Sequence, residues 1–281
     1  MILVTGATGN VGRPLVAELA ASDVKVRALT RDPSTALLPA GVEAARTDEL
    51  GAALEGVEAV FLNPAVFWDG PAELLRLAAE RGVRRVVTMS SSSVVRADVA
   101  SDSPIVIHHR ELEAEVETAC TESGMRWTHL RPDVFATNTL GWAPQVRESG
   151  VVRTAYAQAH SAPVHEADIA AVAALALTEA AGLDGAGPVL TGPESVTQAE
   201  QARLIGEAVG KPVSFEEISR EEAQAALVAQ GAPGGVADTL LDMAAQGVGT
   251  PAEVSPAVER LTGRPAPSYA AWARDHADDF R

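Results

Sequence analysis

Short apolar runs alternate along most of the chain with segments whose apolar residues recur at helical spacing. A short continuous apolar run is typical of a buried strand, and recurrence every three or four residues is typical of an amphipathic helix. The runs predict strands over residues 1–5, 24–30, 42–46, 59–64, 84–89, 127–132 and 188–193. The helical spacing predicts helices over residues 13–20, 49–54, 71–81, 103–123 and 169–180. This alternation favours an α/β fold with a doubly wound parallel sheet that helices cover on both faces.

The remainder of the chain has a mostly helical pattern. A small strand is expected over residues 151–156, and helices are expected over 197–210, 219–230, 235–245 and 267–281. Asp168 has the side chain of an N-cap for the helix that follows it. At 281 residues, the chain can form one large domain, or one domain with a smaller lobe.

The first strand leads into a glycine turn with the pattern Gly-x-x-Gly-x-x-Gly, formed by Gly6, Gly9 and Gly12. Between a strand and a helix, this pattern predicts a dinucleotide site. Gly6 permits the tight exit from the strand, Gly9 lets the backbone approach a pyrophosphate, and Gly12 lets the helix pack closely on the sheet. The free N–H groups at the start of the helix face the anion. The rest of the expected contact surface consists of Thr8, Asn10 and Val11.

The end of the second strand indicates which dinucleotide binds. In this kind of fold that strand end meets the adenosine ribose, where an acidic residue favours NAD. The chain has Thr30 and Arg31 there, a hydroxyl and a guanidinium that suit the 2′-phosphate of NADP(H). Asp32 follows directly and weakens the inference, and Arg31 could also be an ordinary solvated surface residue.

Two further strand ends carry candidate site residues, because ligands gather at the carboxyl ends of strands in such sheets. Asn63 and Pro64 follow one strand and lead into an aromatic loop with Phe67 and Trp68, which is either a lid over a ligand or a hydrophobic plug. The cluster Ser90–Ser93 follows another strand. Its hydroxyls could hold the nicotinamide or a substrate oxygen, or could simply cap the next turn.

His109 and Glu113 lie four residues apart in the expected helix over 103–123 and share one face of it. Such a pair can be a base with the group that orients it, half of a metal site, or a surface pair. No further metal ligand lies nearby in the sequence, so we expect no metal.

The charge balance narrows the class of partner. The formal net charge is −16, which argues against nucleic acid or an anionic membrane as the main partner. The single cysteine, Cys120, excludes an internal disulfide and a cysteine metal cluster. No signal-like start and no apolar run long enough to span a bilayer is present, so a cytoplasmic protein with a small-molecule partner is expected, as a monomer or a homodimer.

Together these motifs resemble the NmrA-like branch of atypical short-chain dehydrogenases/reductases, and the resemblance runs essentially from end to end. The residues that carry it are Val4–Gly12, Leu29–Pro33, Ser90–Ser93, His109-x-x-x-Glu113, Leu130-Arg131-Pro132, Asn138, Leu261–Arg264 and Trp272. The resemblance implies an NADP(H)-binding Rossmann domain over residues 1–135, with contributions from about 163–193. It also implies a smaller, mostly helical substrate-binding lobe over residues 136–162 and 194–281.

The family includes quinone and dye reductases, reductases of plant phenolics, and redox-sensing regulators. By resemblance, Gly6, Gly9 and Gly12 hold the pyrophosphate, Arg31 holds the 2′-phosphate, and the first two residues of Ser90–Ser93 lie near the nicotinamide. Ordinary short-chain dehydrogenases carry Tyr-x-x-x-Lys where this chain reads His109 to Glu113. Tyr156 and Tyr269 are the only tyrosines, and neither is followed by lysine four residues on.

Two functions are compatible with these features. The first is an NADPH-dependent oxidoreductase that transfers hydride to a small apolar or aromatic acceptor, such as a quinone or another conjugated carbonyl, with His109 and Ser91 as candidate catalytic residues. Its expected pocket consists of Phe67, Trp68, Phe135, Asn138, Trp142 and Val164. The second is a redox sensor that binds NADP(H) without turnover and acts through a protein partner.

Overall fold

In the computed structural model, which describes residues 1–67, 70–97, 99–178 and 182–281, the described residues form a central sheet of seven parallel strands. In spatial order these are β3 (Glu43–Arg46), β2 (Val26–Thr30), β1 (Ile2–Thr5), β4 (Ala59–Leu62), β5 (Arg85–Met89), β6 (Arg126–Pro132) and β9 (Val189–Leu190). The direction of the strand order reverses between β1 and β4. The expected ligand crevice lies outside the carboxyl ends of the strands at this switch point.

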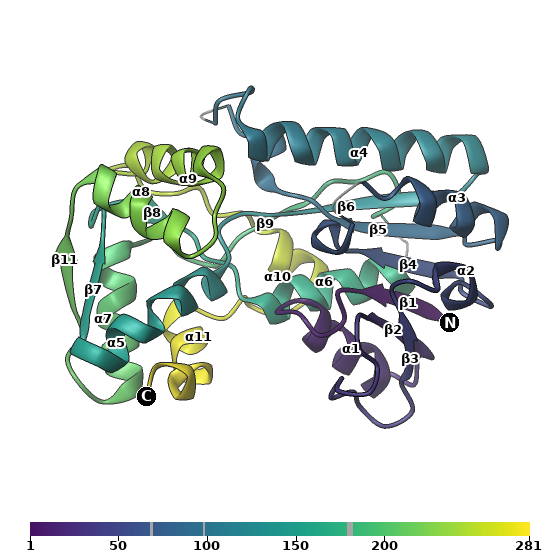
Figure 1. The fold of residues 1–281 in the computed structure, drawn as a ribbon, viewed down its shortest axis with the longest axis horizontal. Helices are drawn as coiled ribbons and strands as arrows, with labels where there is room; N and C mark the ends of the chain where they lie inside the picture. Colours follow the sequence, from purple (N-terminus) through teal and green to yellow (C-terminus); the bar gives the residue numbers. More distant parts are fainter. Residues whose placement is uncertain (68–69, 98, 179–181) are drawn as a thin grey trace.

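Helices cover both faces of the sheet (Figure 1). One face carries α1 (Gly12–Ala21), α6 (Glu166–Thr178) and α10 (Ala257–Thr262). The other carries α2 (Leu50–Ala53), α3 (Ala72–Glu80) and α4 (Pro104–Ser123). The doubly wound fold expected from the alternating pattern is therefore confirmed.

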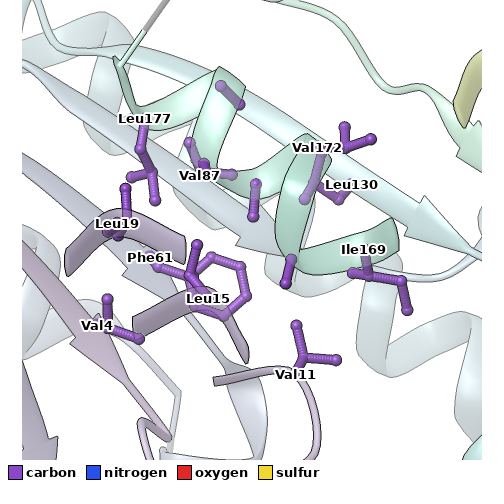
Figure 2. Close-up of a cluster of buried hydrophobic side chains, with 14 of the residues drawn as sticks. Val4, Val11, Leu15, Leu19, Phe61, Val87, Leu130, Ile169, Val172 and Leu177 are labelled. Atoms are coloured by element: carbon purple, nitrogen blue, oxygen red, sulfur yellow. The ribbon is translucent and has the colours of Figure 1, made fainter. Parts of the chain in front are cut away.

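Successive strand residues point to opposite faces, which builds two separate cores. Val4 and Phe61 lie with Leu15 and Ile169 in the core beneath α1 and α6 (Figure 2). The strand neighbours Leu3 and Val60 lie instead in the core beneath α2, α3 and α4. Because each strand is buried on both sides, its sequence is a continuous apolar run rather than an alternating one.

Apart from the short helices η1 (Pro64–Val66) and η2 (Ser92–Val94), which follow β4 and β5, the remaining elements lie together at the left of Figure 1. They are η3 (Ala136–Trp142), α5 (Ala143–Ser149), β7 (Val151–Thr154), β8 (His160–Ser161), β10 (Val196–Thr197), α7 (Gln198–Val209), β11 (Ser214–Glu217), α8 (Arg220–Ala229), α9 (Gly234–Gln246), α11 (Tyr269–Asp275) and η4 (Ala277–Phe280). A third core forms here around Trp272, which is 1% exposed. The boundaries proposed for the two domains stay a prediction.

Two expectations about helix ends are wrong. Helix α6 begins at Glu166, so Asp168 lies inside its first turn and is not its N-cap. His165 serves that end instead, because its Nδ1 accepts the N–H of Ala167 at 3.1 Å. Asp168 is fully buried, and its Oδ1 lies 2.8 Å from Nη2 of Arg264. The helix expected over residues 267–281 is divided into α11 and η4, which meet at His276.

Among the described residues, no helix is long and apolar enough to cross a membrane.

Candidate cofactor and substrate site

The glycine turn lies at the carboxyl end of β1 and is fixed by close backbone packing. Gly6 has a φ of +64°, which favours glycine, and a Cβ there would lie 2.6 Å from Nδ2 of Asn63. A Cβ on Gly12 would lie 2.0 Å from the carbonyl oxygen of Gly6, so no larger residue fits. Thr5 joins the two strands at the switch point, because its hydroxyl donates to the Phe61 carbonyl and accepts the N–H of Asn63 at 2.8 Å.

The same turn leaves donors for an anion. The N–H groups of Gly9 and Arg13 bond within the turn, to the carbonyls of Gly6 and Gly9. Within the described part of the chain, the N–H groups of Asn10, Val11 and Gly12 have no hydrogen-bond partner. Three free N–H groups at a helix start form an anion site, and a pyrophosphate fits this cradle.

The end of β2 presents a cation beside this cradle. Arg31 is exposed and forms no hydrogen bond or ion pair with any residue that the structure describes. The carboxylate of Asp32 is used locally, since its Oδ1 accepts the N–H of Ser34 at 3.0 Å and the hydroxyl of the same residue at 2.6 Å. These two bonds hold the pKa of Asp32 below its ordinary value. Thr30 is buried, and its Oγ1 accepts a long hydrogen bond of 3.4 Å from the N–H of Asp32.

Arg13 is a candidate site residue that the sequence reasoning missed. It follows the glycine turn, and its Nη2 donates to the carbonyl of Thr8 at 3.1 Å. The guanidinium therefore lies against the turn that holds the expected pyrophosphate. An arginine directly after the third glycine is the signal that could have identified it.

The serine cluster lies at the carboxyl end of β5, and its first hydroxyl belongs to a buried network. Ser90 is 4% exposed, and its Oγ donates to Oε1 of Glu113 at 2.6 Å. Arg131 donates to both oxygens of Glu113, from Nε at 2.9 Å and from Nη2 at 2.7 Å. Burial alone would raise the pKa of Glu113, but the bonds from Arg131 and Ser90 outweigh it and lower the pKa.

The next two serines have different partners. Ser91 is half-buried and its Oγ accepts the N–H of Ser93 at 3.2 Å, so its own proton stays available for donation. Ser92 donates to Oδ1 of Asp133 at 2.6 Å, and Arg96 contacts the same carboxylate oxygen at 3.0 Å. The Ser93 hydroxyl has no hydrogen-bond partner among the described residues either, but Ser93 is fully buried. Within this cluster, therefore, Ser91 is the partly exposed residue whose hydroxyl hydrogen is free for a ligand.

His109 does not bond to Glu113 among the described contacts. Its Nδ1–H donates to the carbonyl of Ile105 at 2.9 Å, which leaves Nε2 as the other ring nitrogen. Burial lowers the pKa of His109. At neutral pH the ring is therefore uncharged, and Nε2 accepts hydrogen bonds rather than donating them.

The other predicted residues have varied surroundings. Asn63 accepts the N–H of Ala65 at 3.1 Å and caps the short helix η1 (Pro64–Val66), in which Pro64 is the first residue. Phe67 packs against the core beneath α3 and α4. Trp68 lies outside the described residues.

The rest of the expected pocket lies beyond β6. Phe135 packs against the core beneath α1 and α6, and it pairs with Val164 through a parallel bridge. Asn138 is exposed. Trp142 packs edge-on against Phe215 with ring centroids 6.3 Å apart. That these residues line one substrate pocket stays a prediction.

A groove of about 620 Å³ lies between α3 and α4. It is lined by Ala72, Leu75, Arg76, Ala79, Glu80, Ala114, Glu115, Thr118, Ala119, Glu122 and Ser123. Among the described residues, none of those predicted for the site lines this groove, and no residue of the glycine turn lines it.

Comparison with known proteins agrees with a dinucleotide cradle. Residues 6–180 match a family described as NAD(P)H-binding. The chain belongs to this family. The finding confirms the resemblance to NmrA-like atypical short-chain dehydrogenases/reductases and the expected cofactor class, NAD(P)H.

Several of the similar proteins are named as reductases or oxidoreductases. The chain is 39% identical to (4-alkanoyl-5-oxo-2,5-dihydrofuran-3-yl)methyl phosphate reductase of Streptomyces griseus subsp. griseus, over 100% of this chain and 99% of the relative. It is 35% identical to the NAD(P)H azoreductase of Xenophilus azovorans, over the same shares of the two chains. An NADPH-dependent quinone oxidoreductase from Escherichia coli, solved with NADPH, has a similar structure with a TM-score of 0.77 and 27% identity, covering 98% of this chain and 99% of the other. These similarities support the expectation that the chain is an NAD(P)H-dependent oxidoreductase that acts on small acceptors.

Proposed function

We propose that the chain is an NADPH-dependent reductase of a small conjugated acceptor. The observation that carries the proposal is the cradle itself: three free N–H groups at the start of α1, beside the unpaired guanidinium of Arg31. The first favours a pyrophosphate and the second favours a 2′-phosphate.

The preference for NADP(H) over NAD(H) rests on Arg31 and Asp32. An acidic side chain that bonded the ribose hydroxyls would favour NAD(H). The carboxylate of Asp32 is instead bound by Ser34 within its own turn. Arg31 is therefore the charged group at the end of β2 that is free to bind a phosphate.

NADPH, when bound, supplies a hydride to the acceptor. The chain has to position the acceptor and to stabilise the negative charge that develops on its oxygen or nitrogen. The Ser91 hydroxyl has a free proton at the carboxyl end of β5 and is the donor that we assign to this task. The proton of Ser90 is held by Glu113, so Ser90 contributes only acceptor lone pairs to the cofactor side.

His109 has a weaker claim to the acid role. Its Nδ1–H is used by the carbonyl of Ile105, and burial keeps the ring uncharged near neutral pH. The role that remains for His109 is to accept a hydrogen bond through Nε2, from a hydroxyl or amide of the substrate.

The names of the relatives indicate which acceptors to test. A furanone that carries an alkanoyl group, an azo compound and a quinone all contain a conjugated system. The experiment is therefore to follow NADPH oxidation at 340 nm (the absorption band of the reduced nicotinamide) with acceptors from each of these three classes. Turnover of at least one class, with a lower rate for NADH, is the expected result.

The variants Ser91→Ala and Ser90→Ala divide the roles of the two serines. Losing a donor that stabilises developing charge lowers kcat by about 100-fold or more, so Ser91→Ala should do so with little change in NADPH affinity. Ser90→Ala should change cofactor affinity more than kcat. Equal kcat in Ser91→Ala and the unaltered protein would remove Ser91 from the mechanism.

A redox sensor is the second candidate. It is favoured because two candidate proton donors of the site, Ser90 and His109, are not available to protonate a substrate. The proton of Ser90 is held by Glu113, and His109 is uncharged near neutral pH. Tight NADPH binding without turnover of any acceptor would support the sensor and contradict the reductase.

A further inference from the structure

His129 is a buried histidine for which the proposed reaction has no use. It lies in the middle of β6, its side chain is fully buried, and Trp127 stacks on it with ring centroids 4.5 Å apart. Neither Nδ1 nor Nε2 has a hydrogen-bond partner among the described residues. A fully buried imidazole without a partner is unusual and calls for a ligand or a functional explanation.

Two carboxylates of α4 face this histidine. Nε2 of His129 lies 3.4 Å from Oε1 of Glu117, and one oxygen of Glu113 completes a group whose ligand atoms all lie within 4.8 Å of one another. Glu113 and Glu117 are four residues apart and share one face of the helix. The sequence pairs Glu113 with His109, whereas the fold supplies His129 from β6 as the third side chain.

The distance between His129 and Glu117 suits two ligands of a single metal ion, and the Glu113 oxygen lies within 4.8 Å of both ligand atoms. Zinc binds histidine nitrogen and carboxylate oxygen at about 2.0–2.2 Å, so two ligands of one tetrahedral ion lie about 3.4 Å apart. The distance between His129 and Glu117 agrees with this value.

Glu113 can join such a site without losing its other partners. Its carboxylate offers about four lone-pair positions, and Ser90 and Arg131 use three of them. The remaining position is on Oε2, where Arg131 donates through Nη2 alone. The side chain of Glu117 is 45% exposed, which provides a path for the ion and room for a water as fourth ligand.

We propose that Glu113, Glu117 and His129 form a zinc site that joins α4 to β6 behind the serine cluster. The two carboxylates bring a combined charge of −2 to the group, and Arg131 pairs with Glu113 beside it. The proposal does not depend on the reductase function, because the site would bind metal whether or not NADPH is turned over.

The test is metal binding by the full chain after removal of metal with a chelator. Co²⁺ is titrated first because it reports a tetrahedral nitrogen and oxygen site by visible absorption, and Zn²⁺ is then used to displace it. One ion per chain, together with a rise in Tm on adding Zn²⁺, is the expected result. Removing a direct ligand should weaken binding by at least about 100-fold, so Glu117→Gln and His129→Gln should both lose the absorption band.

The controls keep the outcome clear. Glu122→Gln changes an exposed carboxylate on the same helix and should leave binding unchanged. Glu117 is on the surface, so Glu117→Gln tests the site even where replacement of the buried His129 disturbs folding. The absence of stoichiometric Co²⁺ and Zn²⁺ binding, or binding that survives Glu117→Gln, would overturn the proposal.

Discussion

The guanidinium of Arg131 binds both oxygens of the Glu113 carboxylate, at 2.9 Å from Nε to Oε1 and 2.7 Å from Nη2 to Oε2. The side chains of Glu113 and Arg131 are 7% and 19% exposed, so this pair is desolvated as well as bidentate. It connects the middle of α4 to the end of β6, and through Ser90 it reaches the end of β5. The pair thus joins the long helix to the two strand ends where the candidate site lies.

The first prediction concerns the removal of Arg131. Breaking a buried pair by removing one partner leaves an uncompensated charge, so Arg131→Met should lower the free energy of unfolding by about 3 kcal/mol. Arg126→Met is the matched control on the same strand. Its partner Asp184 lies 3.2 Å away, but the Arg126 side chain is 52% exposed, so the loss should be below about 1 kcal/mol. The measurement is urea unfolding of both variants. Equal losses of unfolding free energy would contradict the claim that the buried pair stabilises the fold more than the exposed one.

The glycine turn could be predicted from the sequence because its geometry is local. Gly6, Gly9 and Gly12 lie within seven residues, and the strand and helix that flank them follow directly. The arrangement of the sheet follows in the same way from apolar runs and helical spacing. These features can be predicted without knowing which segments distant in the sequence contact one another.

The contacts of Glu113 could not be predicted in this way. The spacing in the helix paired it with His109, whereas the fold pairs it with Arg131 and Ser90 from two strands. The choice depends on how α4 rotates about its axis against β5 and β6, and that rotation follows from the packing of Leu112 and Val116 in the core. The location of the aromatic residues expected in the pocket could not be predicted either. An aromatic side chain can pack in a core or line a pocket, and the sequence does not distinguish these two environments.

The second prediction concerns the fit of the glycine turn. Gly12→Ala places a methyl group 2.0 Å from the carbonyl oxygen of Gly6, so the turn has to shift. Overpacking of this kind costs about 1–3 kcal/mol, and the displaced N–H groups should also abolish NADPH binding. Gly51→Ala is the control in α2, where the nearest atom would be the end of the Arg81 side chain at 3.7 Å. The measurement is calorimetric titration of both variants with NADPH. Equal affinities of Gly12→Ala and Gly51→Ala for NADPH would contradict the assignment of the glycine turn as the pyrophosphate site.

The third prediction concerns the choice of cofactor. A hydrogen bond to a charged group contributes about 1.5–3 kcal/mol, so Arg31→Ala should raise the Kd for NADPH by about 10- to 100-fold. The Kd for NADH should change little, because NADH has no 2′-phosphate. Arg76→Ala is the control, since Arg76 is exposed on α3 and pairs with Glu80 at 2.7 Å. A similar weakening of NADH and NADPH binding by Arg31→Ala would count against the assigned 2′-phosphate contact.

The last prediction is a pH dependence of stability that arises at His276. Nε2 of His276 lies 2.6 Å from Oε1 of Glu166, and Nδ1 lies 2.8 Å from Oδ2 of Asp279, so the C-terminal segment is joined to α6 through a histidine between two carboxylates. The bond to Glu166 raises the pKa of His276 above its ordinary value of 6.5. A group whose pKa is raised by folding stabilises the protein fully below its unfolded pKa and loses that contribution as the pH rises through the folded pKa.

The stabilisation from His276 should therefore be complete below about pH 6.5 and should decline above it. Glu166 acts in the opposite direction, since its pKa is lowered on folding and its contribution is lost only as the pH falls below about 4.5. Urea unfolding between pH 5.5 and 8.5 is the measurement. The difference in unfolding free energy between the unaltered protein and His276→Gln should be largest at the acid end and should narrow towards pH 8.5.

The control is His108→Gln, which changes an exposed histidine on α4. This variant should leave the dependence of the unfolding free energy on pH unchanged. The rings of His276 and Trp272 stack with their centroids 4.6 Å apart. A difference in unfolding free energy that stays constant across this pH range would show that His276 stabilises the fold by this packing rather than by its charge.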